Sequence, residues 1–113
     1  MTKTESGEQQ AVIEFCEYCG IDCIHIANEG KRSARYGAEL KRMGMRKGFP
    51  DMFIPYAKNG FHGLFIELKK DAISKPTKEQ LQWISKLNAA GYYATVCYGA
   101  DAAIREIKKY FKE

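Results

Sequence analysis

The sequence predicts an α/β domain in which helices cover a mixed four-stranded sheet, in the order α-β-α-β-β-α-β-α. Three observations lead to this prediction. Apolar residues recur at helical spacing near both ends of the chain, two short apolar runs flank the turn-forming letters "AKNG", and the aromatic and β-branched run "YYATVCY" follows a glycine that ends a helix. With 113 residues the chain can bury one core but hardly two, so we expect a single domain over residues 1–113.

The composition is that of a soluble globular protein, with 45% hydrophobic and 28% charged residues. No apolar run approaches the roughly 18 residues of a transmembrane helix. The first residues, "MTKTESGEQQ", also lack the apolar core of a signal peptide. We therefore expect a cytoplasmic protein with no membrane association.

The first half of the chain predicts a helix, a strand and a second helix. The first helix covers about Glu5–Cys19 and ends at Gly20, and its apolar positions follow one face: Val12, Phe15, Cys16 and Cys19. The letters "DCIHIA", residues 22–27, indicate a short strand. After the polar loop "NEGKRS", Ser33 can cap a basic helix that runs to about Met43.

The second half begins with a breaker at residues 48–50 and continues with the two β-like runs on either side of "AKNG". Thr77 is a suitable N-cap for the third helix, and Gly91 is a suitable glycine just beyond its end. A strand over Tyr92–Tyr98 follows. The last helix starts at about Asp101 and carries one apolar stripe: Ile104, Ile107 and Phe111.

Four cysteines raise the question of zinc or a disulfide: Cys16, Cys19, Cys23 and Cys97. The first two lie on the apolar face of the predicted first helix, where a free thiol packs as a small hydrophobic group. Disulfides are also rare in a reducing compartment. We predict buried free thiols, with zinc and a disulfide as the less favoured alternatives.

Positive charge is concentrated in one part of the chain, although the formal net charge is only +4. Between residues 31 and 47, Glu39 alone opposes a series of basic residues: Lys31, Arg32, Arg35, Lys41, Arg42, Arg46 and Lys47. Such a series is typical of a solvated helix face or of a surface that binds a polyanion, because clustered cations attract phosphates. Both interpretations stay open on charge alone.

The hairpin around "AKNG" admits two registers. A two-residue turn at Asn59-Gly60 would pair Asp51 with Leu68, which places Asp51 and Glu67 on opposite faces. A three-residue loop over residues 58–60, with Gly60 left-handed and a bulge, would pair Asp51 with Glu67 instead. We favour the second register. It buries both faces of the hairpin, since the other face then holds only apolar residues: Met52, Ile54, Leu64, Ile66 and Leu68.

In the favoured register Lys69 follows Glu67 on the face of Asp51. Two carboxylates directly opposite, with Cβ atoms about 5 Å apart, repel each other unless one is protonated or a cation lies between them. Such a group suits a hard, oxygen-liking ion such as Mg²⁺. The alternative is that these are strand-end charges in solvent, with Glu67 and Lys69 forming an ion pair.

Three further polar residues are candidates for this site. Glu8 lies four residues before Val12 and so continues the buried stripe of the first helix, although a first-turn acid also suits the helix dipole. Gln80 completes the capping-box pattern "TKEQ" and also lies at the inner edge of its helix, so both roles stay open. His25 could contact phosphate or metal-bound water, but a structural histidine is the commoner case.

An ordered set of motifs resembles the virus-type replication-repair nuclease domain, VRR-NUC, a branch of the PD-(D/E)xK nuclease superfamily. The set consists of "HIANEGKRS", then "GFPD" with Asp51, "ELK" over Glu67–Lys69, "PTKEQ" with Gln80, and "GYYATVCYG". The resemblance implies a PD-(D/E)xK nuclease-like fold over most of the chain.

The resemblance also implies roles for individual residues. Asp51, Glu67 and the backbone carbonyl of Leu68 would bind Mg²⁺, with Mn²⁺ able to substitute. Glu8 would match the family's acid on the N-terminal helix, acting on the metal directly or through water. Lys69 would be the catalytic lysine, and Gln80 would help to position the lysine or the phosphate.

The function implied is a metal-dependent, structure-selective DNA endonuclease that acts at four-way (Holliday) junctions as a homodimer, as in similar phage and bacterial enzymes. Six basic residues would hold the DNA backbone: Lys31, Arg32, Arg35, Arg46, Lys47 and Lys70. The alternative is a non-catalytic nucleic-acid-binding module of a replication or repair complex.

Overall fold

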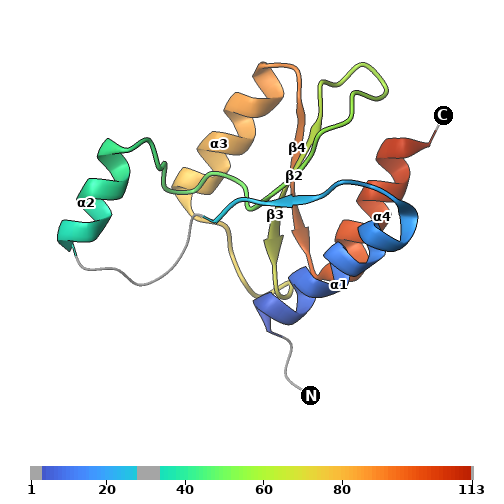
Figure 1. The fold of residues 1–113 in the computed structure, drawn as a ribbon, viewed down its shortest axis with the longest axis horizontal. Helices are drawn as coiled ribbons and strands as arrows, with labels where there is room; N and C mark the ends of the chain where they lie inside the picture. Colours follow the sequence, from blue (N-terminus) through green and yellow to red (C-terminus); the bar gives the residue numbers. More distant parts are fainter. Residues whose placement is uncertain (1–3, 28–33, 113) are drawn as a thin grey trace.

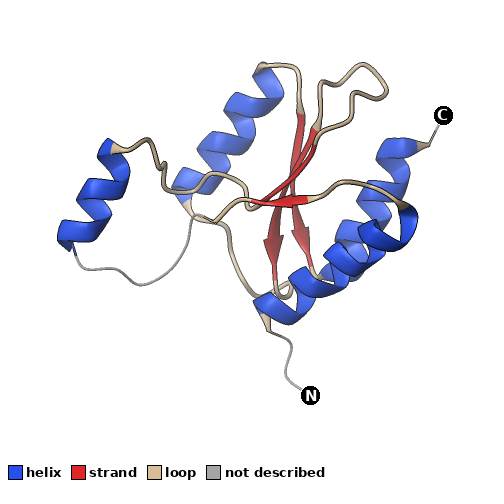
Figure 2. Ribbon diagram, viewed as in Figure 1, coloured by secondary structure: helices blue, strands red, loops and turns tan. Residues whose placement is uncertain are grey.

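The structure is a computed structural model that describes residues 4–27 and 34–112. Within these ranges the order of elements is the predicted one, and Figures 1 and 2 show their arrangement. The elements are α1 (Glu5–Cys19), β1 (Ile24–His25), α2 (Ala34–Arg42), β2 (Met52–Ile54), β3 (Leu64–Lys69), α3 (Lys78–Ala89), β4 (Tyr93–Tyr98) and α4 (Ala100–Phe111).

The sheet is mixed, as predicted, with the strand order β1-β2-β3-β4. The pairs β1/β2 and β2/β3 are antiparallel, whereas β3 and β4 are parallel and are joined through α3. Helices α1 and α4 lie side by side on one face of the sheet and α3 lies on the other, while α2 stands apart from these layers (Figure 1).

Local signals define the ends of the helices. Thr4 caps the first turn of α1, where its side chain accepts a hydrogen bond from the Gly7 N–H, and Gly20 ends the helix at φ 71°. In α3, Thr77 and Gln80 form the predicted capping box. The predicted cap at Ser33 lies outside the described residues.

The hairpin adopts the favoured register, since Met52 pairs with Ile66 and Phe53 with Phe65. The three-residue loop that we inferred is wrong. Lys58 and Phe61 form an isolated bridge around a two-residue turn in which Asn59 and Gly60 have φ angles of 51° and 86°.

The residue pairing at the turn is therefore offset by one residue from the pairing of the strands β2 and β3. Three residues, 55–57, lead from β2 to the turn, but only 62 and 63 lead back to β3. The extra residue forms a bulge, marked by a hydrogen bond of 3.0 Å from the Tyr56 N–H to the Ile54 carbonyl. This bulge allows a two-residue turn to coexist with the strand register expected of a longer loop.

Apolar residues fill both sides of the sheet. The larger cluster lies under α1 and α4 and includes Val12, Met52, Leu68 and Tyr110. The smaller one lies under α3 and contains Phe65, Leu87 and Ala94. Strand β1 is shorter than the predicted residues 22–27.

All four cysteines are free thiols, as predicted, but Cys19 is exposed rather than buried. A hydrogen bond with Cys16, together with burial, raises the pKa of the Cys23 thiol. Burial raises the pKa of Cys97 to about 12.

None of the helices within residues 4–27 and 34–112 is long and apolar enough to cross a membrane.

Candidate metal centre

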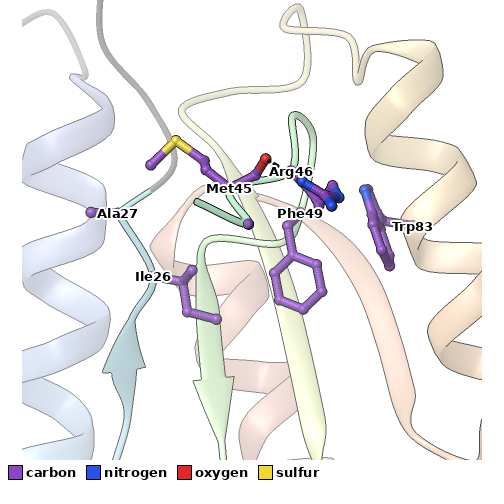
Figure 3. Close-up of a pocket in the computed structure, with 7 residues that line it drawn as sticks. Ile26, Ala27, Met45, Arg46, Phe49 and Trp83 are labelled. Atoms are coloured by element: carbon purple, nitrogen blue, oxygen red, sulfur yellow. Dashed lines mark hydrogen bonds between the residues drawn. The ribbon is translucent and has the colours of Figure 1, made fainter. Parts of the chain in front are cut away.

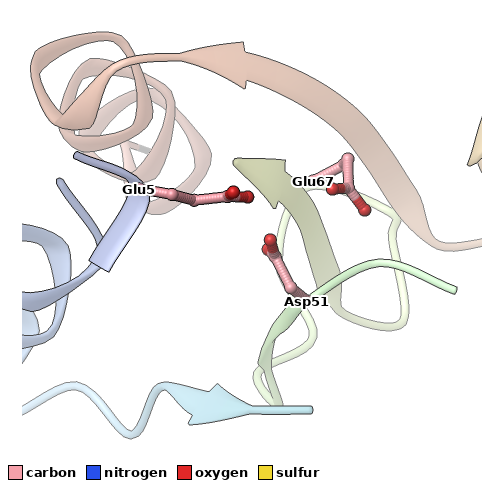
Figure 4. Close-up of side chains that lie close together, drawn as sticks. All are labelled: Glu5, Asp51 and Glu67. Atoms are coloured by element: carbon pink, nitrogen blue, oxygen red, sulfur yellow. The ribbon is translucent and has the colours of Figure 1, made fainter. Parts of the chain in front are cut away.

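Three carboxylates meet at one end of the sheet (Figure 4). Glu5 comes from the first turn of α1, Asp51 from the segment before β2, and Glu67 from β3. One oxygen of each lies within 4.8 Å of the others. The side chains of Asp51 and Glu67 are buried, with only 3% and 1% of each residue exposed, whereas Glu5 is exposed. The cluster therefore has two buried members and one that faces solvent.

Asp51 is fixed by the neighbouring strand. Its Oδ1 accepts a hydrogen bond of 3.2 Å from the Leu68 N–H. The N–H and C=O of a strand residue point to the same side of the strand, so the Leu68 carbonyl also points toward β2. The Gly99 N–H donates to the Lys69 carbonyl at 2.7 Å on the other side, which agrees with this alternation.

The residue opposite Leu68 in this register is Pro50, which has no N–H to donate. The carbonyl of Leu68 therefore receives no ladder hydrogen bond from that position. A carbonyl oxygen beside two buried carboxylates is a suitable further ligand for a hard cation.

Glu67 contacts a lysine and a glutamine. The Lys69 Nζ lies 3.8 Å from Glu67 Oε2, and the Lys69 side chain is only 13% exposed. Gln80 Nε2 donates a hydrogen bond of 3.2 Å to the same oxygen. The face shared by Glu67 and Lys69 is thus the one predicted from the register.

Gln80 performs both of the roles that the sequence left open. Its Oε1 accepts a hydrogen bond of 2.8 Å from the Thr77 N–H, while its backbone N–H donates to Thr77 Oγ1. The amide nitrogen is then free of the capping box and reaches Glu67. One side chain therefore joins the start of α3 to the carboxylate cluster.

Glu8 does not lie where we expected it. Its Oε1 accepts a hydrogen bond of 3.0 Å from the Ala100 N–H, at the first residue of α4. Gly99 at the N-cap has no side chain, so Glu8 supplies the cap from another helix. Glu5, one turn earlier in α1, takes the place in the carboxylate cluster.

The sequence interpretation missed Glu5, although a signal existed. Glu5 is three residues before Glu8 and therefore projects from a similar face of α1. It is also the first residue of the helix, where an acid is favoured by the dipole.

His25 contacts the backbone beside the cluster rather than a carboxylate. Its Nδ1 lies 3.1 Å from the Asp51 carbonyl oxygen, which also accepts a hydrogen bond of 2.7 Å from the Ile26 N–H. A carbonyl can only accept, so Nδ1 carries the proton. These bonds fix the backbone of Asp51 against β1.

The basic residues are distributed over several elements. Lys31 and Arg32 lie outside the described residues. Arg35 is exposed on α2, and Lys47 and Lys70 are exposed in the segments before β2 and after β3. Arg46 donates hydrogen bonds from Nη1 to the carbonyls of Lys41 and Met45, at 2.9 and 3.1 Å, so it also holds the end of α2.

This set of oxygen donors fits a divalent hard cation. The structure provides carboxylate oxygens from three segments. The nearby carbonyl oxygen of Leu68 lies opposite Pro50, which has no N–H to donate to it. A bound cation would offset the repulsion among the carboxylates. Lys69 adds a positive group close enough to act on an anion at the same place.

Comparisons with known proteins give one family. The sequence profile of the VRR-NUC domain matches residues 30–101, which contain Asp51, Glu67, Lys69 and Gln80. No curated protein sequence matches the chain.

Solved structures of VRR-NUC domains are similar to this fold. One, a VRR-NUC domain protein, is 31% identical with a TM-score of 0.80, and the match covers 98% of this chain and 90% of that one. A second, a VRR-NUC domain, has a TM-score of 0.68 over 97% of this chain and all of its own, and at 22% identity it supports the fold alone.

Proposed function

Because this chain belongs to the VRR-NUC domain family, we propose that it is a metal-dependent nuclease that hydrolyses phosphodiester bonds in DNA. The observation that carries the proposal is the pair of buried carboxylates, Asp51 and Glu67, next to Lys69. Burial of two acids at one place is costly unless a cation binds there. A cation at that position attracts phosphate.

Asp51, Glu67 and the Leu68 carbonyl would hold Mg²⁺ or Mn²⁺, and Glu5 would contribute a further oxygen from α1. When bound, the ion would polarise a phosphoryl oxygen and lower the pKa of water in the site. The other tasks belong to the protein. Because Glu5 is exposed, a DNA strand would approach the site from the start of α1.

Lys69 is suited to stabilise charge on the reacting phosphate. Its ammonium group is held beside Glu67 and is mostly removed from solvent, which strengthens its interaction with an anion. It would orient the attacking water or stabilise the negative charge that develops on the phosphoryl oxygens. Gln80 is a positioning residue, because it acts on Glu67 through a hydrogen bond.

The finer features of the activity follow the resemblance. We propose cleavage within the strand, leaving a 5′-phosphate and a 3′-hydroxyl, with a preference for four-way junctions. A two-fold homodimer would supply two sites for symmetric cuts. The DNA backbone would be held by basic residues around the site: Lys31, Arg32, Arg35, Arg46, Lys47 and Lys70.

The test compares wild-type protein with Asp51→Asn and Lys69→Ala on duplex, flap, single-stranded and four-way DNA, in Mg²⁺, Mn²⁺ or chelator. We expect the wild-type protein to cut only with metal, and each variant to lose at least about 100-fold in rate. Asp101→Asn and Lys109→Ala, at exposed positions of α4, are the matched controls. Wild-type rates in Asp51→Asn would disprove the assignment.

The alternative is a non-catalytic module that binds nucleic acid through its basic residues. Such a module would bind DNA equally well in chelator and would cut none of the four substrates. The buried carboxylates favour the nuclease, because acids near phosphate weaken a simple binding surface.

A further inference from the structure

An apolar pocket has no role in the proposed hydrolysis, and Figure 3 shows the residues that line it. Its volume is about 310 Å³. Seven residues line it: Ile26, Ala27, Gly44, Met45, Arg46, Phe49 and Trp83. Arg46 is the only charged residue among these seven.

The pocket and the metal centre share one segment of backbone. Phe49 lies two residues before Asp51, and the Ile26 N–H donates to the Asp51 carbonyl at 2.7 Å. Trp83 lies on α3, one turn after Gln80, whose amide reaches Glu67. A ligand group in the pocket would therefore sit beside a phosphate at the metal centre.

The pocket lies on the face of the sheet that α3 covers, and Glu67 points to the same face, whereas Glu5 reaches the carboxylates from α1 on the other face. Asp51 and Glu67 alternate in phase with Phe53 and Phe65, whose rings stack at 4.5 Å between centroids. Phe49 contacts Phe65 edge to face at 5.4 Å, and it contacts Trp83 at 5.1 Å. The aromatic groups thus form a continuous layer from the sheet to the pocket.

Two cationic side chains lie against this layer, and a third follows in the sequence. Arg46 lines the pocket, Lys47 is the next residue, and the Lys86 ammonium lies 5.0 Å from the centroid of the Trp83 ring. Apolar and aromatic walls with a cationic rim complement a nucleotide, whose base is flat and apolar on its faces and whose phosphates are anionic. A purely apolar occupant would have no use for the cations.

We propose that this pocket receives one unpaired base of the DNA strand whose phosphate lies at the metal centre. The inference rests on the proposed function, because it takes DNA as the ligand and places its phosphate at the metal centre. Trp83 and Phe49 would contact the face or edge of the base, and Arg46 its flanking phosphate.

Such a pocket gives a physical cause for selectivity toward irregular DNA. Moving a base out of a paired stack costs free energy, and the cost is smallest where the base is already unpaired. Branched or bulged DNA would then bind better than perfect duplex without any reading of sequence.

The experiment uses Trp83 as its reporter, because it is the single tryptophan of the chain. The full-length protein is titrated in chelator with three DNA duplexes: one with a single unpaired adenine, one with an abasic unit at that position, and one fully paired. We expect the adenine duplex to quench Trp83 fluorescence and to bind at least about 10-fold more tightly than the abasic one.

A pair of methionines gives matched variants. Met45→Asp places a carboxylate in the pocket, whereas Met43→Asp makes the same charge change at a side chain that is 77% exposed and does not line it. We expect the adenine preference to vanish in Met45→Asp and to persist in Met43→Asp. Circular dichroism of both variants checks the fold, and the comparison of the three duplexes on wild-type protein needs no variant.

Equal affinity and equal quenching for the adenine and abasic duplexes would overturn the proposal. Cleavage in Mg²⁺ is measured in parallel. Cutting without adenine preference refutes the pocket alone, and adenine preference without cutting refutes the nuclease alone.

Discussion

At the scale of single residues, two glutamates one helical turn apart in α1 have different tasks. Glu5 joins Asp51 and Glu67, while Glu8 caps α4 through the Ala100 N–H. The first task concerns the chemistry of the site and the second concerns stability, so the two can be separated by mutation.

Glu5→Ala should affect metal binding and Glu8→Ala should affect stability. Glu5→Ala should weaken Mn²⁺ binding at least several-fold with little change in stability, since the residue is exposed and two carboxylates remain. Glu8→Ala should lower the free energy of unfolding by about 1 kcal/mol through the lost cap. Titration calorimetry with Mn²⁺ and urea denaturation check the pair. Weaker metal binding in Glu8→Ala alone would restore our first assignment.

The sequence interpretation chose Glu8 on α1, whereas the glutamate of α1 that lies beside Asp51 and Glu67 is Glu5. Helical phase identifies the side on which an acid projects, and Glu5 and Glu8 share that side approximately. Which of the two reaches Asp51 depends on how far α1 is displaced along its axis relative to the sheet. That displacement is set by the packing of Val12 and Cys16 in the core, which no local pattern reports.

Tyr93 should make stability depend on alkaline pH. Burial and then its hydrogen bond to Glu106 raise the pKa of Tyr93 to about 12, from about 10 when unfolded. Between these values the unfolded chain loses the proton and the folded one retains it, so stability falls as pH rises through this window. In Tyr93→Phe the decline measured by urea denaturation should be shallower. Parallel curves for the two proteins would contradict this.

At the scale of elements, the start of α3 is tied to the metal centre twice. Gln80 bonds to Glu67, and the backbone of Gly48 lies directly against Glu79 and Gln80. A Cβ at Gly48 would be only 2.7 Å from the Gln80 nitrogen. The glycine therefore lets the segment that carries Asp51 approach the helix that supports Glu67.

Gly48→Ala should be far more damaging than Gly60→Ala. The two glycines have nearly equal φ angles, 85° and 86°, but a Cβ at Gly60 meets nothing within 4 Å. Backbone strain of about 1 kcal/mol is therefore common to both. The clash at Gly48 should add about 2 kcal/mol and reduce cleavage. Urea denaturation and DNA cleavage measure these effects, and equal losses would show that the close approach is unimportant.

The ends of α1 and α3 were predictable because each of these helices carries its own boundary signals. Thr77, Gly20 and Gly91 ended or began helices as expected, since caps are local chemistry. The turn of the hairpin was not predicted correctly. The register of the strands depends on the packing of both faces, and the type of turn depends on Asn59-Gly60. The bulge that makes the two compatible has no recognisable sequence pattern.

At the scale of the whole molecule, metal binding should stabilise the fold. Two buried acids that repel each other in the free protein gain a shared counter-charge when a cation binds, and a ligand at 100 times its dissociation constant stabilises by about 2.7 kcal/mol. For a domain of this size that raises Tm by roughly 10 °C.

Asp51→Asn should abolish this response. Asparagine keeps an oxygen for the Leu68 N–H but removes one negative charge, so in chelator its Tm should equal or exceed that of the wild type. Thermal unfolding across a series of Mg²⁺ and Mn²⁺ concentrations tests both proteins. A wild-type Tm that is independent of metal would count against the metal centre.

The bulge between β2 and the turn has a consequence for how such a gene can change. Strand alternation makes the metal centre depend on the register of β2 and β3, and hardly on which residues connect them. Substitutions over residues 55–57 should therefore be tolerated widely. A single-codon deletion there would leave two residues on each side of the turn, so the bulge would disappear while Asp51 stayed opposite Glu67. Natural variants should therefore occur with or without the extra residue in this limb, and the identities of its residues should vary widely.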